Sequence, residues 1–200
     1  SPQRRNILEQ LGIPFEVVPG VTAATAVPTY AGIPLTHRDH TASVAFVTGH
    51  EDPTKPESKL HWKELATGIG TLVFFMGMKN LRNIVNNLVT NGRSADTPVA
   101  LIQWGTRTDQ RVVTGTLKDI VPKVKEAKLG PPAIIVVGEV VSLRDKLNWF
   151  ESKPLFGKRI VVTRSRDQAS VFAETLIDRG ATPIEFPSIE SRYGKSIPLG

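Results

Sequence analysis

The sequence predicts an α/β protein with five strands in its larger part and a second, shorter α/β unit behind it. Three observations lead to this expectation. Aliphatic and β-branched runs of strand length alternate with segments in which apolar residues recur at helical spacing. Glycine and proline separate the two kinds of segment. The alternation starts again after a charged, proline-containing stretch at residues 151–154, which predicts a domain boundary there.

The first forty residues are expected to hold a helix end, a short strand and a second helix. Apolar residues at helical spacing stop at Gly12, and an apolar run at residues 15–18 predicts a strand. Small apolar residues predict a helix over 21–30. A helix end and one strand cannot bury themselves, so we expect residues 1–40 to complete a domain whose earlier part lies outside this chain, and to connect it to the next.

Residues 41–151 are expected to form one α/β domain. Its strands are expected at residues 43–48, 71–75, 99–103, 110–114 and 133–137. Its helices are expected at residues 62–66, 81–88 and 117–126, with a charged loop at 55–59. Strands interspersed with helices at this density indicate a single α/β layer structure. Glycine or methionine follows several of the strands, and strand ends are where α/β sheets bind ligands.

Residues 152–200 are expected to open a further domain. The elements expected there are a strand, a helix and a strand, at residues 159–163, 167–179 and 182–186. Val171, Leu176 and Ile177 are expected to form the buried face of the helix. This unit is too short to be a whole domain.

Composition narrows the class of function. The net charge of +6 favours an anionic partner, but the basic residues are scattered, which argues against a nucleic-acid tail. The sequence has no cysteine, which excludes disulfides and thiolate sites. His37, Asp39 and His40 match no metal-ligand spacing, so no metal is expected. The apolar runs are of strand length and no secretory signal is present, so we expect no membrane span and a cytoplasmic location.

Several separated motifs carry a family resemblance. They are Val-Pro-Gly-Val-Thr-Ala-Ala at 18–24, Ala-Gly-Ile-Pro-Leu-Thr-His-Arg-Asp at 31–39, Val-Thr-Gly-His-Glu at 47–51, Thr-Leu-Val-Phe-Phe-Met-Gly at 71–77 and Leu-Arg-Asp-Lys-Leu-Asn-Trp-Phe at 143–150. In this order they resemble the uroporphyrinogen-III C-methyltransferases of the tetrapyrrole methylase family, over roughly residues 6–150.

The resemblance implies a two-domain enzyme that holds S-adenosyl-L-methionine between two α/β domains and releases S-adenosyl-L-homocysteine. Residues 1–40 would then end the amino-terminal methylase domain. Residues 41–151 would be the carboxy-terminal methylase domain, with a mixed five-stranded sheet and flanking helices. The implied reaction is methylation of two ring carbons of uroporphyrinogen III to precorrin-2, on the route to sirohaem and cobalamin. The implied assembly is a homodimer.

The resemblance also implies five cofactor-binding residues. Thr22 and Ala23 lie at a helix start, which offers free N–H groups and a hydroxyl. Met76 would form a wall between cofactor and tetrapyrrole, and Gly105 and Ala133 would contact the adenosine through their backbone. The structural alternatives are a helix cap at Thr22, core filling at Met76 and an ordinary turn at Gly105.

Two residues are implied on the substrate side. Arg38 would pair with a carboxylate of uroporphyrinogen, which carries eight of them, and Met76 would contact the macrocycle. The family's glycine- and proline-rich loop, its Gly-Gly-Asp segment and its proton-handling residues have no counterpart here. We therefore expect no catalytic residue in this chain. By itself it should be inactive and should bind the cofactor weakly.

The last part of the chain carries a second resemblance. Residues 156–187 are similar to the opening of the uroporphyrinogen-III synthases, which implies a bifunctional methyltransferase and synthase, a lyase. Two other functions stay open: a tetrapyrrole methylase with a different tetrapyrrole or ribosomal RNA as substrate, and a non-catalytic dimerisation fragment. A nucleic-acid-binding module has little support, because the sequence has neither a recognition motif nor a basic stripe with aromatics.

Overall fold

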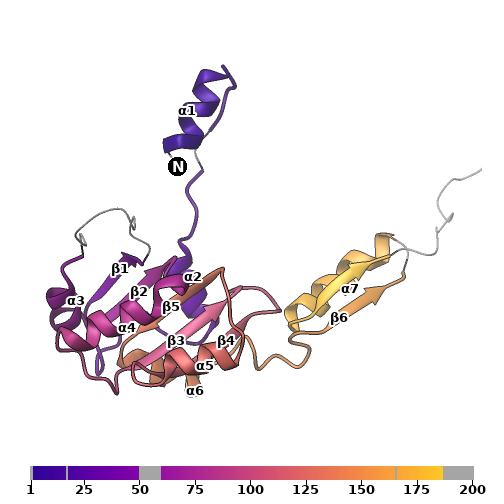
Figure 1. Cartoon of the computed structure of the whole chain (residues 1–200). Helices are drawn as coiled ribbons and strands as arrows, with labels where there is room; N and C mark the ends of the chain where they lie inside the picture. Colours follow the sequence, from indigo (N-terminus) through magenta and orange to yellow (C-terminus); the bar gives the residue numbers. More distant parts are fainter. Residues whose placement is uncertain (1, 17, 50–59, 165, 187–200) are drawn as a thin grey trace, which may run out of the picture.

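The computed structural model describes residues 2–16, 18–49, 60–164 and 166–186. A mixed five-stranded sheet with helices on both faces forms the bulk of these residues (Figure 1). Helix α1 (Pro2–Gln10) lies apart from the sheet (Figure 1). A small unit of two strands and one helix follows the five-stranded sheet in the sequence. Within the described residues, no helix is long and apolar enough to span a membrane.

The sheet has the strand order β1-β2-β5-β3-β4. Strand β1 (Val44–Thr48) runs parallel to β2 (Thr71–Phe75). Strand β5 (Ala133–Val137) lies between β2 and β3 (Pro98–Gln103) and is antiparallel to both. Strand β4 (Arg111–Thr116) closes the other edge, antiparallel to β3. The α/β class and the mixed five-stranded sheet are thereby confirmed.

One face of the sheet packs against three helices, α3 (Trp62–Gly68), α4 (Leu81–Thr90) and α5 (Ile120–Glu126). Leu72 and Phe74 of β2 point to this face and are fully buried. The side chains that the helices bring to this core are Ala66, Leu81, Ile84, Val85, Leu88, Ile120 and Val124. Their spacing on α4 follows the helical period, which explains why this helix forms on this face.

The opposite face packs against α2 (Ala23–Tyr30) and the 3-10 helix η2 (Glu139–Leu143), which runs into α6 (Arg144–Leu147). Val73 of β2 points this way, because successive strand residues alternate between faces. The central strands are therefore buried on both sides, and they read as continuous apolar runs rather than as alternating ones.

Three expectations in the first two parts of the chain need correction or lie outside the structure. The strand expected at residues 15–18 is wrong: residues 15, 16 and 18 are exposed and pair with no strand among the described residues. A strand needs a hydrogen-bonded neighbour, and the apolar run there has none. The helix expected from residue 117 begins at Ile120. The charged loop at residues 55–59 lies outside the described residues.

The small third unit has the predicted strand–helix–strand order. Strand β6 (Arg159–Val162) is parallel to β7 (Thr182–Glu185), and α7 (Arg166–Asp178) connects them. Leu176 is buried, but Val171 and Ile177 are 68% and 52% exposed, so their expected burial is wrong. A sheet of two strands covers only a narrow face of the helix, and these two side chains lie outside it.

The late start of α5 comes from Asp119, which folds back on the end of β4. One carboxylate oxygen of Asp119 accepts the backbone N–H of Thr116 at 2.7 Å, and the other lies 2.7 Å from Lys123 Nζ. The hydrogen bond from Lys123, followed by that from Thr116, lowers the pKa of Asp119 below its ordinary value of 3.8. The ionised carboxylate therefore stabilises the folded chain.

This pair predicts a small pH-dependent stability. Since the folded-state pKa lies below the unfolded one, the contribution is complete above about pH 4 and is lost as the pH falls through the folded-state pKa. Asp119→Asn should cost less than about 1 kcal/mol at pH 7, because the pair is exposed to solvent. Urea unfolding at pH 7 and pH 3 should show the cost shrinking at the lower pH. If the loss of unfolding free energy in Asp119→Asn grew towards pH 3, the lowered pKa would not belong to Asp119. The same would follow if Asp96→Asn, at an exposed position, showed the same pH dependence.

Candidate functional site

The sheet topology brings three strand ends to one edge. Strands β2 and β3 are each antiparallel to β5, so they run in the same direction and their carboxyl ends meet where β5 begins. Met76 follows β2, Trp104 follows β3, and Ala133 is the first residue of β5. These residues surround one cavity of about 610 Å³. It is lined by Ala23, Val27, Phe75, Met76, Met78, Lys79, Ile102, Trp104, Gly105, Arg107, Pro131, Pro132, Ala133 and Ile134.

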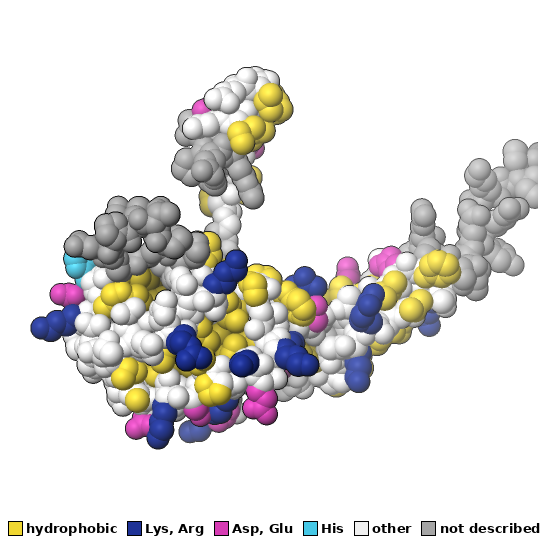
Figure 2. Space-filling model, in the orientation of Figure 1, with side chains coloured by type: hydrophobic (Ala, Val, Ile, Leu, Met, Phe, Trp, Pro, Cys, Tyr) yellow, Lys and Arg dark blue, Asp and Glu magenta, His cyan; other side chains and the backbone are white. Residues whose placement is uncertain are grey.

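The lining is apolar apart from two cations. Lys79 and Arg107 are the charged residues among those that line the cavity. Figure 2 shows a hollow on one face of the molecule that is yellow with hydrophobic side chains, with dark-blue Lys and Arg side chains around it. Arg107 is fixed by an ion pair with Asp109, whose carboxylate lies 2.9 Å away, and it stands 5.8 Å from the ring centre of Trp104. An apolar floor with cations beside it suits a flat organic ligand that carries anionic groups.

Helix α2 forms one wall of the cavity. Thr22 is its N-cap residue, and the Thr22 hydroxyl accepts the backbone N–H of Ala24 at 3.3 Å. The cap directs the first turn so that Ala23 and, one turn on, Val27 face the cavity. Thr22 itself is not among the lining residues. Its structural role as a cap is therefore observed, and its contact with a ligand stays a prediction.

The two turns at the ends of β2 and β3 form another part of the cavity wall and have an unusual backbone. Met76, Trp104 and Thr106 have φ of 52°, 49° and 73°, in the left-handed region. Such residues cost about 1–3 kcal/mol each and cluster at ligand sites. The Met76 side chain is 64% exposed, so it does not fill the core. The exposure of Met76 beside the cavity favours a contact with a ligand over a role in filling the core.

Gly105 lies between these strained residues and α2. A Cβ atom at this position would come within 2.4 Å of Val27 Cγ1 and 2.8 Å of Val27 Cβ. Real side chains do not approach so closely, so the absence of a side chain allows the turn to pack directly on the helix. A glycine is therefore needed here because the turn packs closely on Val27. An ordinary turn would not need a glycine for this reason.

Several lining residues were not predicted from the sequence. Trp104 and Arg107 flank the predicted Gly105, and the signal that could have found them is their place directly after a buried strand. Val27 could have been found one helical turn after Ala23. Lys79 lies in η1 (Met78–Asn80), which packs beside the end of β2, and no sequence pattern marked it.

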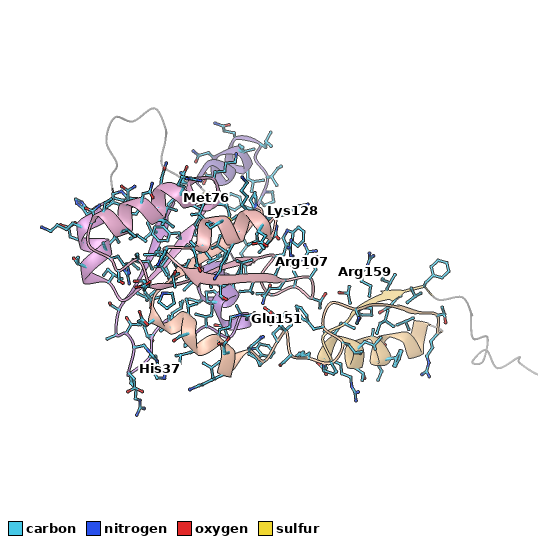
Figure 3. All side chains as sticks on the ribbon, turned by 60° about the horizontal axis from the view of Figure 1, so that its bottom comes forward. His37, Met76, Arg107, Lys128, Glu151 and Arg159 are labelled. Carbon is cyan, nitrogen blue, oxygen red and sulfur yellow. The ribbon has the colours of Figure 1, made fainter. Side chains whose placement is uncertain are left out.

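The structure does not bring Arg38 to the cavity. Arg38 is exposed in a tight turn that the His37–Thr41 bridge closes, and it is not among the lining residues. In Figure 3, neighbouring His37 lies at the far side of the molecule from Met76. His37 Nδ1 lies 3.8 Å from the Asp39 carboxylate. The described residues contain no group of three or more side chains that could hold a metal ion.

Comparison with known proteins assigns this chain to a family. The family model for Tetrapyrrole (Corrin/Porphyrin) Methylases matches residues 4–121. The chain belongs to the tetrapyrrole methylase family. The matched residues include Thr22, Ala23, Met76 and Gly105, whereas Ala133 and the segment that covers the sheet behind it follow the match.

Individual members of the tetrapyrrole methylase family are also similar to this chain. The uroporphyrinogen-III C-methyltransferase of Bacillus subtilis (strain 168) is 44% identical over 185 residues, which is 92% of this chain and 38% of that protein. The S-adenosyl-L-methionine-dependent uroporphyrinogen III methyltransferase of Methanosarcina barkeri is 56% identical over 135 residues, 68% of this chain and 53% of that protein. This chain thus spans about half or less of these curated relatives.

A solved structure in the family has the same fold. The uroporphyrin-III C-methyl transferase of Thermus thermophilus, in complex with S-adenyl homocysteine, matches with a TM-score of 0.54 and 29% identity. The match covers 71% of this chain and 60% of that one. The relation therefore holds at the level of sequence and of the overall fold.

Proposed function

We propose that the protein containing this chain methylates carbon atoms of uroporphyrinogen III with S-adenosyl-L-methionine, and that the strand-end cavity is this chain's share of the cofactor site. The observation that carries the proposal is the convergence of Ala23, Met76, Gly105 and Ala133, from four separate segments, on one cavity. The names of the similar methyltransferases support the same reaction. A cofactor-bound relative supports the same cofactor.

The cavity fits the cofactor in size and chemistry. Its volume of about 610 Å³ is in the range of small-molecule sites, roughly 300–1,000 Å³. The apolar floor, which includes Ile102 and Ile134, suits an adenine ring, and Gly105 leaves backbone accessible beside it. When bound, S-adenosyl-L-methionine supplies an electrophilic methyl group. The residues of this chain would orient it and exclude water, and such a transfer needs positioning more than proton transfer.

The substrate side of the site would use charge. Lys79 and Arg107 are the cations that the structure brings to the cavity, and uroporphyrinogen III is a polycarboxylate. Charge-assisted hydrogen bonds from these two groups would hold carboxylates at the edge of the macrocycle. Exposed Met76 would then separate macrocycle and cofactor. Arg38 stays a candidate for a more distant carboxylate only, since it lies away from the cavity.

The same proposal covers the organisation of the whole protein. Residues 1–40 would end an amino-terminal methylase domain, 41–151 would form the carboxy-terminal one, and 152–200 would open a uroporphyrinogen-III synthase-like domain. The β6–α7–β7 unit supports the last boundary by its parallel strands and its own small core. The Bacillus alignment, which omits only about fifteen residues of this chain, must extend into this unit. A homodimer is the assembly we propose, and light scattering would test it.

The proposal is tested on the full-length protein. Labelled S-adenosyl-L-methionine should transfer its methyl groups to uroporphyrinogen III and not to ribosomal RNA. Ala133→Leu should raise the dissociation constant of S-adenosyl-L-homocysteine about tenfold, because the added atoms project into the cavity. Thr90→Leu, on the exposed end of α4, serves as the control. Methylation of the RNA alone would refute the substrate, and unchanged affinity in Ala133→Leu would refute the site.

A further inference from the structure

A chain of buried polar side chains lies behind the cavity and touches both of its walls. Gln110 is 4% exposed, and the side chains of Arg144 and Glu151 are 14% and 17% exposed. Arg144 Nη2 lies 2.6 Å from one carboxylate oxygen of Glu151. The other carboxylate oxygen accepts a hydrogen bond from Gln110 Nε2 at 2.7 Å. None of the three residues lines the cavity.

One end of this network holds the strained turn after β3. Gln110 Oε1 accepts the backbone N–H of Thr106 at 2.9 Å, and the backbone N–H of Gln110 donates to the Arg107 carbonyl at 3.0 Å. Thr106 and Trp104 both have φ in the left-handed region. A backbone in this region persists only where its surroundings hold it. Gln110 is the side chain that does so here.

The other end holds helix α2. Arg144 Nη1 donates to the Ala31 carbonyl at 2.5 Å, just past the last turn of the helix, and Gln110 Nε2 lies 3.4 Å from the Tyr30 carbonyl. Beside it, Trp149 Nε1 donates to the Thr29 carbonyl at 3.2 Å. Side chains from the turn before β4 and from the segment after β5 therefore donate to carbonyls at the end of the helix, where few backbone partners remain. Figure 3 shows Glu151 near the end of the sheet that also carries Arg107.

The energetics favour a role in geometry over one in stability. A buried ion pair gains little net stability, since desolvation offsets most of its attraction, but it fixes the groups that it joins. Here the joined groups are the two walls, with Ala23 and Val27 on one side and Trp104 and Gly105 on the other. A shift of either wall would change the shape of the cavity, because the two walls meet where Gly105 packs directly on Val27.

We propose that Gln110, Glu151 and Arg144 are positioning residues that set the affinity of the cavity for its nucleoside ligand without touching it. The inference rests on the proposed function for the identity of that ligand. The cofactor contacts give no role to the Leu143–Phe150 motif or to Glu151 just after it, and this inference assigns them one.

The test is Glu151→Gln in the full-length protein. Glutamine keeps an acceptor for Gln110 but removes the charge that holds Arg144. We expect the dissociation constant of S-adenosyl-L-homocysteine and the KM for S-adenosyl-L-methionine to rise about tenfold, with kcat within about twofold of the wild type. Asp119→Asn, which breaks an ion pair on α5 away from the cavity, should leave the affinity unchanged.

A second variant keeps the inference testable if the first is unstable. Gln110→Met retains the size of the side chain and the Arg144–Glu151 pair but frees Thr106, and it should weaken ligand binding by a similar factor. Wild-type affinity in either folded variant would overturn the inference and leave the proposed function intact. A wild-type protein that binds no S-adenosyl-L-homocysteine would instead contradict the proposed function itself.

Discussion

Gly105→Ala is expected to weaken S-adenosyl-L-homocysteine binding about thirtyfold and to destabilise the protein by about 1–3 kcal/mol. The added Cβ would lie 2.4 Å from Val27 Cγ1, so helix α2 and the turn after β3 must separate. Both elements line the cavity, and the strained backbone at Trp104 leaves the turn little freedom to adjust. Isothermal titration and urea unfolding of the full-length protein would measure the two effects.

A double-mutant cycle identifies the cause. Val27→Ala removes the two methyl groups nearest to the new Cβ, so the Gly105→Ala/Val27→Ala protein should lose less stability than the sum of the single changes. Gly68→Ala is the matched control, because a Cβ there would meet nothing within 4 Å. Additive losses in the cycle would show that the two residues do not touch. If Gly68→Ala also weakened S-adenosyl-L-homocysteine binding, the loss of affinity in Gly105→Ala would not be specific to the contact with Val27.

Arg93→Met is expected to lower the free energy of unfolding by about 2–4 kcal/mol. The guanidinium of Arg93 donates to three carbonyls at the end of α3, those of Leu65, Ile69 and Gly70, at 3.2, 2.9 and 2.6 Å. Burial lowers the pKa of Arg93, and the charge of Glu139 opposes this shift. An arginine stays charged at neutral pH all the same, so its loss leaves partly buried carbonyls without a charged donor.

Thermal unfolding would measure the loss of stability in Arg93→Met as a change in Tm. For a protein of this size the loss corresponds to a fall in Tm on the order of 10 °C. Methionine keeps an apolar stem in place, so the change isolates the hydrogen bonds. Arg82→Met, on the exposed face of α4, should change Tm by no more than about 2 °C. Equal Tm values for the two variants would show that the three hydrogen bonds from Arg93, in the loop after α4, do not stabilise the end of α3.

The elements with the strongest local patterns were predictable from sequence. Strands β2, β3 and β5 are continuous apolar runs that end at a glycine, a methionine or a polar residue, and α4 has a clear helical period. The short segment at residues 15–18 is also rich in residues that favour strands, but it forms no strand in the described residues. Composition shows that a segment can join a sheet, but the presence of a neighbouring strand decides whether it does.

The candidate site divides in the same way. Motif resemblance selected Ala23, Met76, Gly105 and Ala133, all of which line the cavity. It also selected Thr22 and Arg38, which do not. Lys79 and Arg107 were missed because a surface cation carries no local signal of its own. The link between Gln110 and Glu151 joins residues 41 positions apart, and no period or motif relates them.

The sequence alone determined the α/β class, the order of the central strands and helices, and the family motifs, because these depend on local periodicity and on residue identity at fixed spacing. The tertiary structure alone decided which strand ends meet, which cations reach the cavity and what holds its walls together. These depend on the antiparallel insertion of β5 between β2 and β3. Contacts between distant segments form only when the whole sheet assembles, so local patterns cannot encode them.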